Sequence, residues 1–108
     1  MNYNVLFTAD ATKDLEELYE YIYLNDVPGK ADLVLDRIEK KINELNNFPE
    51  RGIYPKELLA LGIKEFREVF FKPYRIIYRI IKKDIYIMLI VDGRRDMQTL
   101  LGRRLLES

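Results

Sequence analysis

The chain has 108 residues, of which 48% are apolar and 33% are charged, with five glycines, four prolines and no cysteine or histidine. This length fits a single domain, residues 1–108, and the composition excludes a disordered or collagen-like chain, disulfides and any site built on Cys or His. The 18 cationic and 18 anionic side chains cancel overall, but residues 1–50 have a net charge of −6 and residues 51–108 one of +6, which indicates a surface in the second half suited to an acidic partner or a polyanion.

The first half of the chain contains one strand pattern followed by two helical patterns. Residues 3–8 are mainly apolar and suit a short strand. Apolar side chains then recur at helical spacing over residues 11–23, where Thr8 or Asp10 can cap the start, and again over residues 28–45. Because only a few residues separate the two helices, they are expected to form an antiparallel helical hairpin.

The second half has the pattern of a loop, three strands and a closing helix. Residues 48–64 contain two prolines and two glycines and predict a loop, with one helical turn over residues 56–61. Asp96 can cap a final helix. Runs rich in Ile, Phe, Tyr and Val predict strands over residues 65–71, 74–81 and 85–91. The expected order β-α-α-β-β-β-α predicts an α+β fold, with the N-terminal strand and the helical hairpin packed on one face of a mostly antiparallel sheet.

Arginines are the candidate target-binding residues. Alternation along residues 74–81 puts two arginines and two isoleucines on one face, which predicts a half-solvated groove able to bind phosphate or carboxylate. Three more arginines from flanking segments are expected to converge there. The candidates are Arg67, Arg75, Arg79, Arg94 and Arg95. Under the alternative interpretation, these arginines merely pair at the surface with Glu65, Glu68, Asp92 and Asp96.

Other charged residues predict no further site. Three carboxylates on the first helix, Asp10, Asp14 and Glu17, are interpreted as a solvated face and not as metal ligands. Arg103 and Arg104 are interpreted as favourable charge near a helix C-terminus. No metal or other cofactor is expected. No apolar run could span a bilayer and the first residues lack the basic start of a signal peptide, so the expected location is cytoplasmic, without a membrane partner.

Three segments resemble the sheet of the RelE/ParE superfamily of toxins. They are residues 62–69 (GIKEFREV), 73–79 (PYRIIYR) and 91–96 (VDGRRD). That superfamily also begins with a strand and a two-helix hairpin, so the resemblance covers almost the whole chain. It implies a toxin of a type II toxin–antitoxin system, also called a plasmid stabilisation protein, which inhibits growth unless a cognate antitoxin binds it. It also implies contact with operator DNA only through the antitoxin.

The resemblance leaves two molecular targets open. RelE-like members cut mRNA on the ribosome without a metal, whereas ParE-like members poison DNA gyrase. Arg75 and Arg95 match arginines of the RelE-like site, and they are the catalytic candidates if the chain is a ribosome-dependent mRNA endoribonuclease. However, residues 66–68 replace the expected lysines, and leucines occupy positions 100–101, near the expected C-terminal aromatic or imidazole group.

A cleaving enzyme needs a group that takes the 2′-hydroxyl proton, and no such group is evident. The ParE-like branch is therefore favoured, with the endoribonuclease as the alternative and a plain protein-interaction domain as a third interpretation. Whether the chain is an enzyme stays open at this point.

Overall fold

The computed structural model describes residues 2–107. Its strands form one sheet in the order β1-β4-β3-β2, in which β1 runs parallel to β4 and the other neighbours are antiparallel. The elements are β1 (Asn4–Phe7), α1 (Ala9–Asn25), α2 (Lys30–Glu44), α3 (Lys56–Leu59), β2 (Arg67–Phe71), β3 (Tyr74–Ile81), β4 (Asp84–Asp92), α4 (Met97–Leu101) and the π-helical turn η1 (Gly102–Leu106). This arrangement confirms the predicted α+β fold.

The helical hairpin forms as the sequence predicts, with small differences at its ends. The hydroxyl of Thr8 accepts a hydrogen bond from the N–H of Ala11 at 3.1 Å and so caps α1. The second helix begins at Lys30, two residues later than expected, because Gly29 adopts the left-handed conformation with φ 86°. Every helix within residues 2–107 is too short or too polar to cross a bilayer.

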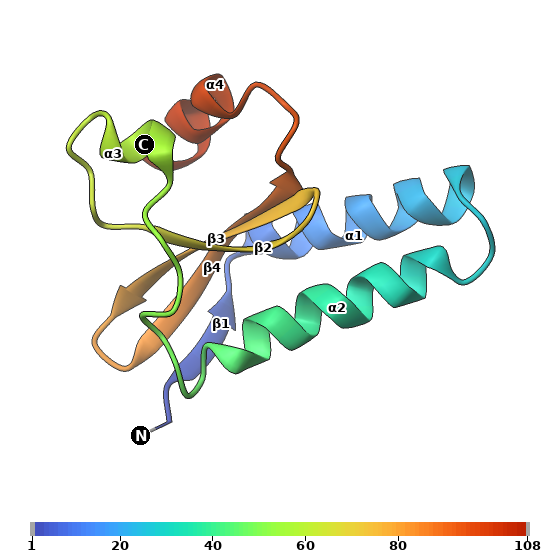
Figure 1. The fold of residues 1–108 in the computed structure, drawn as a ribbon, viewed down its shortest axis with the longest axis horizontal. Helices are drawn as coiled ribbons and strands as arrows, with labels where there is room; N and C mark the ends of the chain where they lie inside the picture. Colours follow the sequence, from blue (N-terminus) through green and yellow to red (C-terminus); the bar gives the residue numbers. More distant parts are fainter. Residues whose placement is uncertain (1, 108) are drawn as a thin grey trace.

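α1 and α2 cover one face of the sheet, as Figure 1 shows. Their apolar residues are spaced three or four apart, which brings one side of each helix onto the strands. The buried members of this first cluster are Ala11, Ile22, Ala31, Val34, Ile38, Ile42, Leu45, Val69, Ile76, Tyr78, Ile85, Ile87 and Ile90. The prediction that the hairpin packs on the sheet is confirmed.

The opposite face of the sheet differs from the expected half-solvated groove. α3 and α4 lie over it (Figure 1), and a second apolar cluster fills the space between. Its buried members are Leu58, Phe66, Ile77, Leu89, Val91, Met97, Leu100 and Leu101. The prediction of a half-solvated groove is therefore wrong for Arg75 and Ile77, which are buried, whereas Arg79 and Ile81 farther along β3 stay partly exposed. Because α3 and α4 are only four and five residues long, their apolar spacing does not reveal which face they cover.

A β-bulge at Met88 lets β4 contribute to both clusters. Ile77 pairs with Leu89 and Tyr78 pairs with Ile87, which leaves Met88 without a partner on β3. The extra residue shifts the alternation, so that Ile87 faces the first cluster and Leu89 the second.

Candidate functional site

The arginine loop, which we define as residues 92–95, joins β4 to α4. The N–H of Gly93 donates to the carbonyl oxygen of Pro73 at 2.7 Å, and two further N–H groups of the loop donate to oxygens of Asp92 at 2.9 and 3.3 Å. A loop whose backbone hydrogen bonds are already made loses little freedom on binding. The loop therefore presents its two arginine side chains from a preorganised backbone.

The two arginines of the loop differ in their electrostatic surroundings. The Nε of Arg94 lies 3.0 Å from Oδ1 of Asp92, and this hydrogen-bonded ion pair lowers the pKa of the Asp92 carboxyl. The side chain of Arg94 is nevertheless 76% exposed. Arg95 is also exposed, and no carboxylate among residues 2–107 forms an ion pair with its guanidinium. Arg95 is thus the cation of the loop that is most available to a partner.

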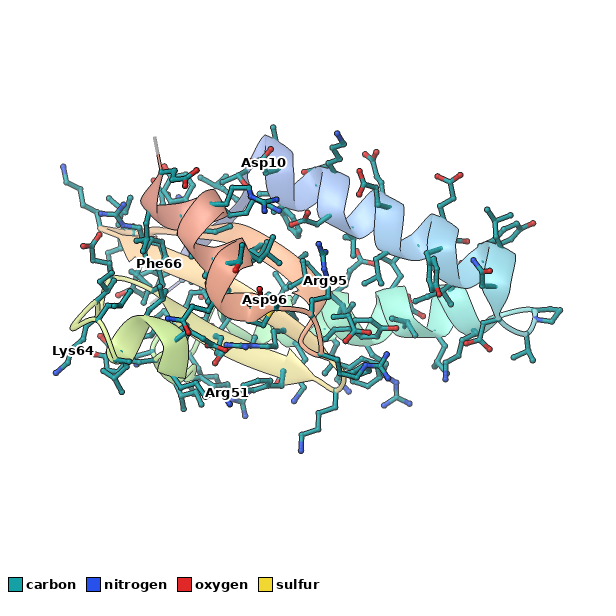
Figure 2. The ribbon with its side chains drawn as sticks, turned by 90° about the horizontal axis from the view of Figure 1, so that it is seen from above. Asp10, Arg51, Lys64, Phe66, Arg95 and Asp96 are labelled. Atoms are coloured by element: carbon teal, nitrogen blue, oxygen red, sulfur yellow. The ribbon has the colours of Figure 1, made fainter. Side chains whose placement is uncertain are left out.

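An open cleft of about 780 Å³ separates the arginine loop from α1. Asp14, Glu17 and Asp26 line it from α1 and its C-terminal end, and the arginine loop contributes Asp92, Arg94 and Arg95. Figure 2 shows Arg95 beside the start of α4, on the side of α1. Its uncharged lining includes Leu18, Tyr21, Ile22, Tyr74 and Ile90. A cleft with both signs of charge and aromatic side chains suits a protein surface better than a bare polyanion.

Arg75 lies beneath the arginine loop and is only 7% exposed. Its Nε donates to the carboxylate of Glu68 at 2.6 Å, and its two terminal nitrogens each donate to the carboxylate of Glu57 at 2.8 Å. The guanidinium therefore bridges β2 and α3 from its position on β3. A side chain predicted to bind the target is in fact enclosed by protein.

The Glu57–Arg75–Glu68 cluster is charged but locally neutralised. The hydrogen bonds from Arg75 lower the pKa of Glu57, whereas burial raises the pKa of Glu68 in spite of the same cation. Both carboxylates in turn raise the pKa of Arg75, which stays protonated. Little of its charge is left to attract an external anion.

Arg67 and Arg79 leave the sheet on opposite faces. Arg67 pairs across the sheet with Tyr78, whose ring belongs to the first cluster, so both point to the α2 side. The guanidinium of Arg67 lies 4.7 Å from the centre of the Tyr54 ring. Arg79 points to the other face, where a nitrogen lies 3.5 Å from a carboxylate oxygen of Glu65.

The structure thus brings two of the five candidate arginines together at the cleft, Arg94 and Arg95. Arg75 lies directly beneath their loop but is enclosed by protein, whereas Arg67 and Arg79 do not line the cleft. Three of the four carboxylates named in the alternative interpretation do pair with candidate arginines. The pairs are Arg75–Glu68, Arg79–Glu65 and Arg94–Asp92, of which Arg75–Glu68 is buried and not at the surface. Asp96 instead caps α4, as predicted, by accepting hydrogen bonds from the N–H and the hydroxyl of Thr99.

Sequence reasoning missed the role of Asp14 and Arg104. Asp14 was interpreted as part of a solvated acidic face and Arg104 as favourable charge near a helix C-terminus, but they form a two-pronged ion pair with side chains 13% and 19% exposed. Asp14 also lines the cleft. No local spacing signals a pair separated by 90 positions. Within residues 2–107, no cluster of three or more acidic side chains is placed to hold a metal ion.

Comparison with known proteins gives one family. Residues 5–97 match the model of the family described as ParE toxin of type II toxin-antitoxin system, parDE. Toxin ParE3 from Caulobacter vibrioides is 29% identical to the chain over 100 residues, which cover 93% of this chain and 96% of that protein.

Three solved structures have a similar fold. The chromosomal ParDE system from P. aeruginosa aligns with a TM-score of 0.68 at 20% identity, covering 83% of this chain and 95% of that one. The RelBE2 toxin-antitoxin complex from Mycobacterium tuberculosis aligns with a TM-score of 0.61 at 21% identity, covering 85% of this chain and 99% of that one. A mutant of E. coli toxin RelE in the free state aligns with a TM-score of 0.65 at 18% identity, covering 97% of this chain and 100% of that one. These likenesses concern the fold.

Proposed function

Because the chain belongs to the ParE toxin family of type II toxin–antitoxin systems, we propose that it inhibits growth by binding and poisoning DNA gyrase. It is the toxin component of such a system, as the resemblance of its strand segments predicted. The contact surface in this proposal is the arginine loop together with the cleft beside α1. Poisoning by binding needs a shaped surface and not a proton-transfer group.

The burial of Arg75 is the observation that carries this proposal. Ribonucleolytic cleavage needs a general base and preorganised cations at the scissile phosphate. Of the two arginines that match the ribonuclease site, Arg75 is enclosed and already bound by Glu57 and Glu68. Of these two, Arg95 alone is left to meet a phosphate, and the chain contains no histidine to act as a general base. This arrangement supports binding over cleavage.

An antitoxin is the regulatory partner in this proposal. The similar structures from P. aeruginosa and Mycobacterium tuberculosis are toxin–antitoxin systems, which supports the same partnership for this chain. The exposed arginines of the loop suit a partner segment that carries carboxylates, and the apolar residues of the cleft suit its apolar side chains. Operator DNA is expected to be contacted through the antitoxin alone.

Induction of the chain without its antitoxin tests the proposed target. We expect growth arrest with gyrase-dependent DNA breaks, and no cleavage of mRNA in purified translating ribosomes. Replacing Arg94 and Arg95 together by Ala should abolish the breaks without lowering the melting temperature. Arg37→Ala is the matched control, because Arg37 is an exposed cation on α2 and away from the cleft.

Two results would overturn the proposal. Codon-positioned cuts in ribosome-bound mRNA by the wild-type protein would make the chain an endoribonuclease of RelE type. Gyrase-dependent breaks that persist unchanged in the Arg94→Ala, Arg95→Ala double variant would move the contact surface away from the arginine loop.

A further inference from the structure

Gly93 packs directly on the aliphatic part of the Arg75 side chain. A Cβ atom at position 93 would lie 2.6 Å from Cδ and 2.8 Å from Cγ of Arg75, and 3.2 Å from the carbonyl oxygen of Pro73. The φ angle of Gly93 is not positive, so the position requires glycine for close approach and not for its backbone conformation. The turn of the arginine loop therefore rests on the Arg75 stem.

The guanidinium group of Arg75 is fixed by hydrogen bonds. Three hydrogen bonds of 2.6 to 2.8 Å bind its guanidinium to Glu57 on α3 and to Glu68 on β2. A planar guanidinium can bind one carboxylate through two parallel N–H groups and a second carboxylate through Nε, whereas a lysine ammonium lacks this fixed planar arrangement of donors. Side-chain exposures of 4% for Glu68 and 13% for Glu57 leave little water to compete for these bonds.

We propose that Arg75 is a positioning residue for the arginine loop, because its ion-paired side chain supports Gly93 and so sets the direction in which Arg94 and Arg95 face the cleft. The inference rests on the proposed function for the identity of the target, but its structural part does not. It assigns to α3 an indirect role in target binding, since Glu57 fixes Arg75 from α3 without lining the cleft.

Two measurements on the full chain test the inference. The first is the NMR chemical shift of the Gly93, Arg94 and Arg95 amides, and the second is the affinity for gyrase. In Arg75→Met, which keeps an unbranched stem but loses both ion pairs, we expect displaced loop amides and an affinity lower by about tenfold, the effect of losing one important interface contact. Glu57→Gln, a milder change outside the loop, should displace the same amides by a smaller amount.

Matched controls separate positioning from general stability. Arg79→Met removes an arginine from the same face of β3, but its partner Glu65 is exposed and distant from the loop, so both readouts should stay unchanged. Ile38→Val loosens the first cluster on the other side of the sheet. If Ile38→Val lowers the melting temperature as much as Arg75→Met does, we still expect its loop amide shifts and its gyrase affinity to match those of the wild type. If Ile38→Val reproduces the effects of Arg75→Met, Arg75 is a stability residue only and the inference is wrong.

The direct contact between Arg75 and Gly93 gives a second criterion. Gly93→Ala should weaken gyrase binding in the wild-type background, where the new methyl group meets the Arg75 stem. It should have a much smaller additional effect in an Arg75→Ala background, where that stem is absent. Additive effects would count against the inference. Failure of the wild type to bind gyrase would remove the proposed target, whereas unchanged loop amides in both Arg75→Met and Glu57→Gln would remove the positioning role.

Discussion

Arg104 and Asp14, which are 90 positions apart in the sequence, form two parallel N–O hydrogen bonds of 3.0 and 2.9 Å. The pair also hydrogen-bonds backbone groups of β4 beyond residues 84–87, the part of that strand that pairs with β1. Asp14 accepts the N–H of Ile90 at 3.1 Å, and Arg104 donates to the carbonyl oxygen of Met88 at 3.2 Å. The C-terminal turn η1 is thereby fastened to α1 and to the sheet.

Removal of Arg104 is expected to destabilise the fold. Arg104→Ala leaves the part-buried Asp14 carboxylate and the Met88 carbonyl oxygen without this donor, which should lower the free energy of unfolding by about 1–3 kcal/mol. The neighbouring Arg103 is exposed, so Arg103→Ala should change it by less than about 0.5 kcal/mol. Urea unfolding of the two variants checks this, and equal losses would mean that the ion pair contributes nothing.

Two glycines are expected to respond oppositely to substitution by alanine. A Cβ at Gly52 would lie 2.6 Å from the Tyr78 hydroxyl and 2.7 Å from the Glu68 carbonyl oxygen, so Gly52→Ala should cost about 1–3 kcal/mol. Gly102 is helical and has no atom within 4 Å of the new Cβ, so Gly102→Ala should stabilise by about 0.5–1 kcal/mol. Chemical denaturation of both variants measures the contrast. A harmless Gly52→Ala would show that the loop at residues 49–54 can move away from β3.

Packing of α2 against the sheet is tested by two substitutions on the same helix. Ile38 is fully buried in the first cluster, and Ile38→Ala should lower the free energy of unfolding by about 2–5 kcal/mol through lost contacts and a new cavity. Leu33 is 48% exposed, and Leu33→Ala should change it by less than about 1 kcal/mol. A loss near zero for Ile38→Ala would contradict the position of the helical hairpin.

Acid stability should depend on Glu57. The hydrogen bonds from Arg75 hold the folded-state pKa of Glu57 below its ordinary value of 4.5, so the folded protein binds this proton less readily than the unfolded chain. The carboxylate therefore contributes stability that is fully present above pH 4.5 and is lost as the pH falls through the folded-state pKa. Glu57→Gln should lower stability at pH 7 and make the loss below pH 4.5 less steep.

Unfolding free energies at pH 3, 4, 5 and 7 measure the effect of Glu57→Gln. Glu68 serves as the internal contrast, because burial raises its pKa. A raised pKa makes a carboxyl group favour folding at low pH, and this contribution is lost as the pH rises through the raised value. Glu68→Gln should therefore not reduce the steepness with which the free energy of unfolding falls below pH 4.5. If the free energy of unfolding falls below pH 4.5 in the same way in the wild type and in Glu57→Gln, the role assigned to the Glu57–Arg75 pair is contradicted.

The sequence by itself determined the elements and the family. Apolar residues at helical spacing predicted α1 and α2, alternation and β-branched residues predicted the strands, and Thr8 and Asp96 were identified as caps that the structure confirms. These are local properties, because a helical period or a capping hydroxyl acts within a few residues. The strand segments at residues 62–69, 73–79 and 91–96 carried enough of the family pattern to predict a toxin of this superfamily.

The tertiary structure alone decided which charges are available to a partner. The alternation of Ile and Arg along β3 is the same whether that face of the sheet is exposed to solvent or covered. Arg75 is buried because α3 and α4 pack over it. The partners Glu57 and Arg104 come from segments with no spacing that relates them to Arg75 or Asp14. An ion pair requires two side chains within a few ångströms, and for residues 18 or 90 positions apart that distance is set by how the sheet and its covering helices pack.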